Sequence, residues 1–221
     1  SDDGINWRPP NGNCSWLNPG EKTKLRLREC ATNGNGLWVA VSTNGNATGT
    51  AGSGPLVICS TDNGENWVKA NIPKAVEAMA SMRGTVRYGG GVFFAEMNSG
   101  QNWINRNQAI YSTDGINWNY TNGYPTNTNY DVAYGNGKWF GVKSSQNGNE
   151  TISYKVTSSD GINWRTLPNT VHDYDTNVTD CKFAGNKWVV IYNNEFKRKM
   201  VSYDGERLFV DDGGDIEEPR R

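Results

Sequence analysis

The sequence lacks the long apolar runs and the charge bias that mark several large classes of protein. No apolar run approaches the roughly 20 residues that a membrane helix needs, so we expect no membrane insertion. Lysine and arginine are scattered and the formal net charge is −1, so nucleic acid is a poor candidate partner. The chain has neither a signal peptide nor an initiator methionine, as expected of a processed product or an excised fragment.

Metal-binding patterns are also missing. The cysteines are irregularly spaced without a Cys-x-x-Cys pair, so we expect no zinc site. Free thiols are expected, with a Cys14–Cys30 disulfide as the alternative; Cys59 falls in a predicted strand and Cys181 at a buried apolar position. Residues 172–177 contain, from Asp173, the Asp-x-Asp-x-Asn spacing that starts a calcium loop, but they lack the loop's later glycine and glutamate. They predict a polar turn, and we expect no metal and no cofactor.

Glycine, asparagine and tryptophan are abundant instead. The 26 glycines and 9 tryptophans suit many short strands joined by tight turns rather than helices. The best helix candidate is a turn or so within Ala75–Met82. The composition therefore favours an all-β fold.

One motif recurs along the whole chain: Ser-x-Asp, then a glycine, then an aromatic residue three positions later. Asp-Gly between two apolar runs is a strong hairpin signal, because glycine accepts positive φ. The aspartate can accept hydrogen bonds from the backbone of its own turn, and the tryptophan offers a large face to bury. We expect the following residues to be structural: Asp3, Asp62, Asp114, Asp160, Asp204, Trp7, Trp67, Trp118 and Trp164. In the last copy Leu208 takes the place of the tryptophan.

A second motif alternates with the first. It is a strand, a Gly/Asn turn and an aromatic-rich strand, at about 33–41, 88–95, 134–142 and 183–191. Together the two motifs give four antiparallel strands per repeat, which is a propeller blade, at close to the ~40–50 residues typical of blades.

We therefore predict a single β-propeller domain over residues 1–212. Four complete blades are expected at about 24–70, 84–121, 129–168 and 178–212, after an N-terminal half-blade at 1–9 and before a polar C-terminal tail at 213–221. Two alternatives remain open: a five-bladed ring, in which the N-terminal strand seals a sheet edge, and a fragment of a larger propeller.

The long connections are the expected site of function. In such a blade the tight turns lie at one end, here called the turn end, and the longer connections lie at the other, the loop end. The loop-end segments are 8–23, 42–55, 69–83, 96–109, 119–130, 143–151 and 165–178.

Six loop-end residues are candidate ligand contacts. Trp16 and Trp103 fit neither repeat position, and such rings can stack on a sugar or anchor a protein partner; the alternative is that they cap the core between blades. Arg106 could form a bidentate contact with a carboxylate, or be a solvated loop arginine. The other candidates are Tyr124, Tyr130 and Tyr174, which could line a groove or pack their loops.

The first motif resembles the Asp-box, or BNR repeat, of sialidase-like β-propellers, whose pattern is Ser-x-Asp-x-Gly-x-x-Trp. Residues 60–67 match in full, and the other copies lack the residue between aspartate and glycine. The paired motifs are similar to repeat proteins of bacteria and their phages. Sialidases of this type use three arginines, a Tyr–Glu pair and an aspartate, but the Phe/Tyr-Arg-Ile-Pro motif is absent. Of the loop-end carboxylates, Glu96 with Asp131 is the one pairing left open for a glycosidase.

We therefore expect a non-enzymatic, lectin-like recognition module. Its partner would be a cell-surface glycan bound at the loop end, and its location extracellular, in a phage virion or a secreted bacterial adhesin. The alternatives are a structural protein that docks other virion or adhesin subunits, and a sialidase-like glycoside hydrolase.

Overall fold

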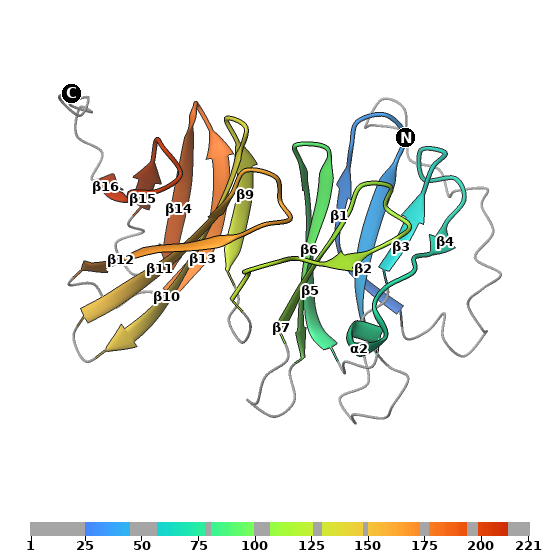
Figure 1. Ribbon diagram of the computed structural model, residues 1–221, viewed down its shortest axis with the longest axis horizontal. Coiled ribbons are helices and arrows are strands. Elements are labelled where there is room, and N and C mark those ends of the chain that lie inside the picture. The colour runs from blue at the N-terminus through green and yellow to red at the C-terminus, as the bar shows by residue number, and fades with distance from the viewer. Residues whose placement is uncertain are drawn as a thin grey trace. The chain divides into compact units, whose positions relative to one another are not determined.

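The computed structural model describes residues 25–44, 57–77, 81–99, 107–125, 130–147, 150–172, 177–193 and 199–211 (Figure 1). Within these ranges the chain forms strands β1 to β16 and one helical turn, α2 (Lys74–Glu77). The all-β prediction is confirmed. In the same ranges, no helix is long and apolar enough to cross a lipid bilayer.

The strands form four antiparallel sheets in which consecutive strands are neighbours. The first blade holds β1 (Leu25–Thr32), β2 (Trp38–Asn44), β3 (Val57–Ser60) and β4 (Val68–Lys69). The second holds β5 (Ser81–Gly89), β6 (Val92–Ser99), β7 (Asn107–Ser112) and β8 (Asn119–Tyr120). The third holds β9 (Asp131–Gly135), β10 (Lys138–Asn147), β11 (Glu150–Ser158) and β12 (Arg165–His172). The fourth holds β13 (Asn177–Ala184), β14 (Lys187–Asn193), β15 (Lys199–Ser202) and β16 (Phe209–Asp211), so the prediction of four complete propeller blades is confirmed.

The chain divides into two compact units, which are described separately. Unit 1 is residues 1–121 and contains the first and second blades; unit 2 is residues 122–221 and contains the third and fourth. The half-blade 1–9 and the tail 213–221 lie outside the described residues. The assignment of 1–212 to one domain stays a prediction.

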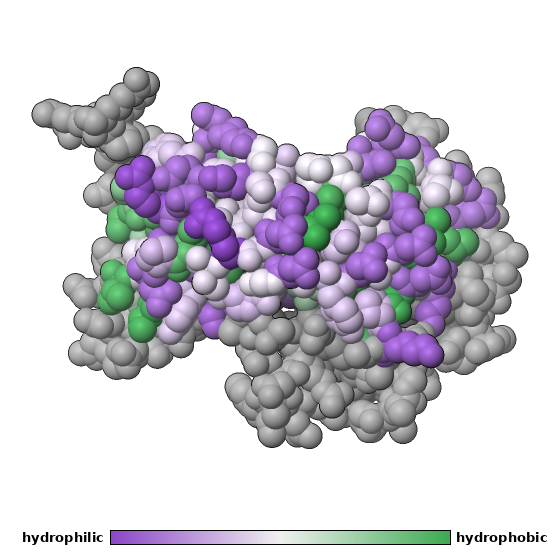
Figure 2. Space-filling view, viewed as in Figure 1, coloured by the Kyte–Doolittle hydropathy of each residue, from purple (hydrophilic) through white to green (hydrophobic). Residues whose placement is uncertain are grey.

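Each unit has a core between its two blades. In unit 1, alternate residues of β2 and β6, such as Val39 and Phe93, are fully buried. In unit 2 the equivalent strands bury Phe140 and Trp188. The period of two follows from the alternation of side chains along a strand. On the face seen in Figure 2, polar residues cover most of the described surface of each unit, and apolar residues form small separate groups.

The predicted helical turn within Ala75–Met82 is confirmed in the first part of that stretch. The turn ends at Glu77, and Ser81 and Met82 belong to β5. The pairing of β5 with β6 already begins at Ser81, so the backbone groups there serve the sheet ladder rather than a helix. Val76 of the helical turn is fully buried in the core of unit 1.

Two predicted loop-end segments are largely strand. β10 continues to Asn147 and β11 begins at Glu150, within the predicted connection 143–151. Similarly, β12 extends to His172 in the predicted connection 165–178. These stretches pair in register across the third blade, so tertiary pairing decided their conformation where local sequence showed little alternation.

The described cysteines are free thiols. Cys30, Cys59 and Cys181 take part in no disulfide, so the alternative Cys14–Cys30 disulfide is not formed; Cys14 itself lies outside the described residues. Cys59 lies in β3, as predicted, and Cys181 is fully buried in the core of unit 2, as predicted. Burial, and then the negative charge of Asp114, raise the pKa of the Cys59 thiol, which keeps it protonated at neutral pH.

Candidate functional site

The Ser-x-Asp turns share most of their hydrogen bonds in the four copies that the structure describes; in the first, the Glu65 N–H donates to the Asp62 main-chain carbonyl instead of the carboxylate. In the second blade the Ser112 hydroxyl donates to Asp114 Oδ1 at 2.9 Å and accepts from the Gly115 N–H at 2.9 Å. Asp114 Oδ1 also accepts from the backbone N–H groups of Ile116 and Asn117, at 2.8 and 2.7 Å. Equivalent contacts occur in the turns that begin at Ser60, Ser158 and Ser202.

An indole closes three of these turns. Trp118 is 5% exposed, and its Nε1 donates to the Gly115 carbonyl at 3.0 Å. Gly115 has a φ of 74°, a conformation that glycine adopts without strain. Trp67 and Trp164 make the same bond to Gly64 and Gly161. Each turn is therefore a closed structural element; Asp3 and Trp7 lie outside the described residues.

These hydrogen bonds keep the turn carboxylates ionised. The backbone N–H of Asn66, with its side chain, lowers the pKa of Asp62 to about 2. Burial alone would raise the pKa of Asp114, Asp160 and Asp204, but the hydrogen bonds outweigh it and each pKa is again about 2. At neutral pH these groups cannot act as general acids.

At the turn end of the first blade, hydrogen bonds connect the two tight turns to each other. The Asn63 N–H donates to the Gly36 carbonyl at 2.9 Å, and Trp38 Nε1 donates to Asn63 Oδ1 at 3.1 Å. The prediction that both tight turns lie at one end is therefore confirmed for this blade. Its hydrogen-bonding groups are used internally, which leaves the loop end as the place to look for ligand contacts.

Two of the six predicted ligand contacts fall in the described ranges. Tyr124 and Tyr130 are both buried in unit 2, with ring centroids 5.6 Å apart in an edge-on arrangement. Tyr124 also meets the turn residue Trp164 edge-on at 5.0 Å. The structure therefore brings the two tyrosines together. The other candidates, Trp16, Trp103, Arg106 and Tyr174, lie outside the described residues.

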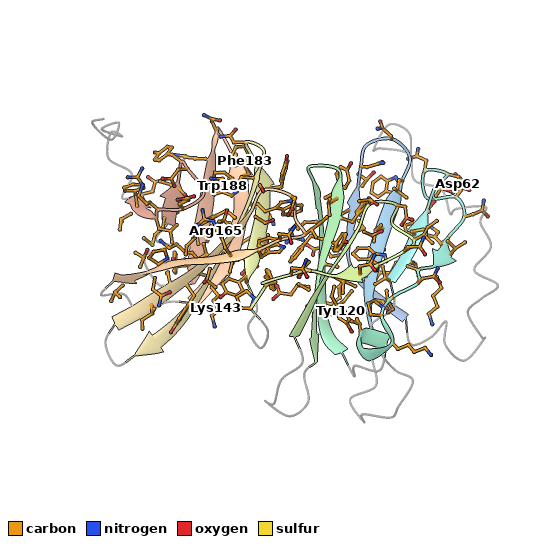
Figure 3. The ribbon with its side chains drawn as sticks, in the orientation of Figure 1. Asp62, Tyr120, Lys143, Arg165, Phe183 and Trp188 are labelled. Atoms are coloured by element: carbon orange, nitrogen blue, oxygen red, sulfur yellow. The ribbon has the colours of Figure 1, made fainter. Side chains whose placement is uncertain are left out.

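A row of side chains continues from Tyr130 across the third blade. Tyr130 immediately precedes β9, and Lys143 of β10 pairs in register with Tyr154 of β11. Lys143 Nζ lies 5.7 Å from the ring centroid of Tyr130 and 4.7 Å from that of Tyr154 (Lys143 is labelled in Figure 3). Both distances are within the range of a cation–π contact. We call Tyr130, Lys143 and Tyr154 the tyrosine–lysine row.

Sequence reasoning missed two members of this row. Lys143 was placed in a predicted connection, and Tyr154 had no assigned role. The signal that could have found them is strand register, because the approach of Lys143 on β10 to Tyr154 on β11 can be predicted only when the strand pairing is known. In the row an ammonium group and two phenol rings lie together near the loop end of the third blade.

The carboxylates of the glycosidase hypothesis fall in different units. Glu96 lies buried on β6 of unit 1, and Asp131 is the first residue of β9 in unit 2. The pairing of Glu96 with Asp131 stays a hypothesis. Among the described residues no group of three or more His, Cys, Asp and Glu side chains could hold a metal ion.

Comparison with known proteins gives a fold and no family. No protein-family model matches the chain, and no curated protein matches it. Several solved structures are similar. A sialidase from Trypanosoma rangeli aligns with a TM-score of 0.56 and 15% identity over 85% of this chain and 37% of that one.

Two other similar structures also belong to sugar-cleaving enzymes. An α-L-arabinofuranosidase from Fusarium graminearum aligns with a TM-score of 0.57 and 12% identity, over 86% of this chain and 67% of that one. The endosialidase of phage phi92 aligns with a TM-score of 0.50 and 10% identity, over 76% of this chain and 30% of that one. The chain thus spans about a third to two thirds of the length of these proteins. At such identities the likeness concerns the fold alone, a β-propeller of four-stranded antiparallel blades.

Proposed function

We propose that the chain is a non-catalytic recognition module that binds carbohydrate at the loop end of its blades, in an extracellular or virion protein. The four described turns are proposed as Asp-boxes of a phage or bacterial repeat. The observation that carries the proposal is the tyrosine–lysine row of unit 2.

The chemistry of the row suits a sugar. Lys143 and Tyr154 are partly exposed, whereas Tyr130 is buried and forms the base of the row. A phenol ring offers an apolar face for the C–H face of a pyranose, and its hydroxyl can donate to or accept from sugar hydroxyls. The ammonium of Lys143 adds a donor that can reach sugar hydroxyl or carboxylate oxygens.

Two further observations support a binding role over catalysis. The turn aspartates are ionised and use their oxygens within their own turns, and the sialidase arginine motif is absent from the sequence. Structures of similar fold belong to enzymes that act on sugars, so the fold is compatible with carbohydrate ligands. The glycoside hydrolase and the subunit-docking protein stay as alternatives.

A glycan array with matched variants tests the proposal. We expect wild-type protein to bind a subset of sialylated, sulfated or neutral glycans. Tyr154→Ala and Lys143→Ala should each weaken that binding about tenfold or more, since contacts of this kind each contribute on the order of 1 kcal/mol or more. Tyr120→Ala removes an exposed tyrosine of unit 1 (Figure 3) and should bind as wild type does.

The other outcomes separate the alternatives. Wild-type binding by both row variants would contradict the site. Binding to none of the glycans would contradict the function and favour subunit docking. Hydrolysis of a sialoside that Glu96→Gln abolishes would show the hydrolase instead.

A further inference from the structure

Unit 2 carries a charged cluster where its two blades meet at the turn end. Arg165 Nη2 lies 2.5 Å from Glu206 Oε1, and Lys138 Nζ lies 3.7 Å from the same oxygen. Lys138 Nζ also donates to the Asp204 main-chain carbonyl at 3.0 Å. Two cations from the third blade therefore share one carboxylate of the fourth blade's turn (Arg165 is labelled in Figure 3).

A third cation lies deeper in the same interface. Lys155 of β11 is 5% exposed and stands in register between Val142 and Leu167, both of which belong to the core of unit 2. It makes no hydrogen bond or ion pair with any residue that the structure describes. Burial lowers the pKa of Lys155, and the negative charges of Asp204 and Glu206 partly offset that effect.

The carboxylates of Asp204 and Glu206 do not provide an ion-pair partner for each of these three cations. Asp204 accepts bonds within its own turn and pairs with Arg207 at 2.8 Å, so little of its capacity is left for the interface. Glu206 is already shared by Arg165 and Lys138. Lys155, which is only 5% exposed, is therefore the cation of this cluster that no described carboxylate pairs with, and a further negative group with several acceptor oxygens would complete it.

Blade packing does not require these charges. In unit 1 the positions equivalent to Lys138 and Lys155 are Leu37 and Val57, and the position equivalent to Glu206 is Ile116. These three residues belong to the apolar core of unit 1 or pack against it. At these three positions the same backbone therefore packs without charge; the ion pair between the blades of unit 1, Arg87 with Glu29, joins β5 to β1 instead.

We propose that Lys138, Lys155 and Arg165 form a binding site for a small oxyanion, such as a sulfate or carboxylate group, between the two blades of unit 2. Arginine presents paired donors to such a group, and the two ammonium groups supply further charge-assisted bonds. The site is separate from the tyrosine–lysine row, and so from the proposed carbohydrate function.

Sulfate is the first probe. Calorimetric titration with sodium sulfate, against sodium chloride at matched ionic strength, should show saturable binding and a matching rise in Tm. Lys155→Met should weaken sulfate binding about tenfold or more, because a bond to a charged group is lost. Lys182→Met alters a lysine that is 55% exposed and paired with Asp180 outside the cluster, so it should bind as wild type does.

Glu206→Gln provides a second, independent variant. It removes the carboxylate that competes with the oxyanion, so sulfate should bind more tightly than to wild type. A merely structural cluster would lose stability in this variant without gaining sulfate affinity. Equal effects of sulfate and chloride on wild type, or unchanged sulfate binding by Lys155→Met, would overturn the proposal.

Glucuronate and glucose distinguish the sources of the anion. Tighter binding of glucuronate than of glucose, lost in Lys155→Met, would point to the carboxylate of an acidic saccharide. Binding of sulfate without glucuronate would point to the free inorganic ion. Either result supports an oxyanion site, and binding of neither contradicts it.

Discussion

Beside the turn of the second blade, unit 1 joins its two blades with amide groups and apolar side chains, whereas unit 2 uses charges at the equivalent place; the ion pair of unit 1, Arg87 with Glu29, lies between β5 and β1. In unit 1, Asn71 Nδ2 donates to Asn117 Oδ1 at 2.9 Å, and the backbone of Asn71 bonds to Ile116 and Trp118 at 2.7 and 3.0 Å. This contact ties the end of the first blade to the turn of the second. Behind it, the facing side chains are apolar.

In unit 2 both partners of that contact are changed. Pro168 occupies the position of Asn71 and has no N–H to donate, and Arg207 occupies the position of Asn117. The ion pairs of Arg165 and Lys138 with Glu206 lie there instead. Elsewhere in unit 2 the amide contact persists, because Asn122 Nδ2 donates to Asn163 Oδ1 at 3.0 Å.

Deeper in the interface the contrast continues. Tyr192 of unit 2 donates to or accepts from Ser153 at 2.8 Å, at the position where unit 1 has the apolar Met97. Burial raises the pKa of Tyr192 to about 12, so the phenol stays neutral. The comparison shows that the two units keep the same turn structure, while the side chains packed between their blades differ. At this position, and at those of Lys138, Lys155 and Glu206, unit 2 carries polar side chains where unit 1 carries apolar ones.

The largest expected effect comes from exchanging the residues at one equivalent position. Val57→Lys would bury an unpaired ammonium in the apolar core of unit 1 and should lower the free energy of unfolding by about 4 kcal/mol or more. Lys155→Met should instead be neutral or stabilising by about 1–3 kcal/mol in chloride buffer, since it removes a buried charge. Urea denaturation measures both. A large loss in Lys155→Met would contradict the view that its charge is dispensable for folding.

An intermediate effect should be common to both units. Asp114→Ala and Asp160→Ala each remove the acceptor of the turn and should cost about 1–3 kcal/mol. Because the folded pKa values are lowered, this stabilisation is present above the unfolded pKa of about 3.9 and is lost as the pH falls toward 2. Tm should therefore fall less steeply below pH 4 in the variants than in wild type. A pH slope unchanged in both variants would speak against this role.

The smallest expected effect is a difference between the two units in how their stability depends on salt concentration. Glu206→Gln should cost about 1 kcal/mol or less at low ionic strength, and less again in 1 M sodium chloride, because the Arg165 and Glu206 side chains are 58% and 42% exposed. Asn117→Ala breaks the amide contact of unit 1 and should cost about 1 kcal/mol at either salt concentration. Equal salt dependence of stability in the two variants would contradict the distinction between a charged contact in unit 2 and an amide contact in unit 1.

Local sequence was enough to predict the blades. The turn Ser112–Trp118 contains its own hydrogen-bonding partners, so its motif predicts its structure wherever it recurs. Cys181 could likewise be placed in the core from its repeat position. Such features depend on contacts a few residues apart.

Features that depend on contacts between strands or blades could not be predicted. The row of Tyr130, Lys143 and Tyr154 exists only in the register of β9, β10 and β11. The approach of Arg165 to Glu206 spans 41 positions and requires two blades to pack face to face. Only the packed structure brings such residues together.

The most direct test of the recognition site is an NMR titration of the tyrosine ring resonances with the glycan that binds best on the array. The rings of Tyr130 and Tyr154 should shift with saturation. Those of Tyr120, on the outer strand of the second blade, and Tyr203, in the fourth blade's turn, should stay unchanged. Shifts of Tyr203 and Tyr120 with none at Tyr154 would contradict recognition at the tyrosine–lysine row.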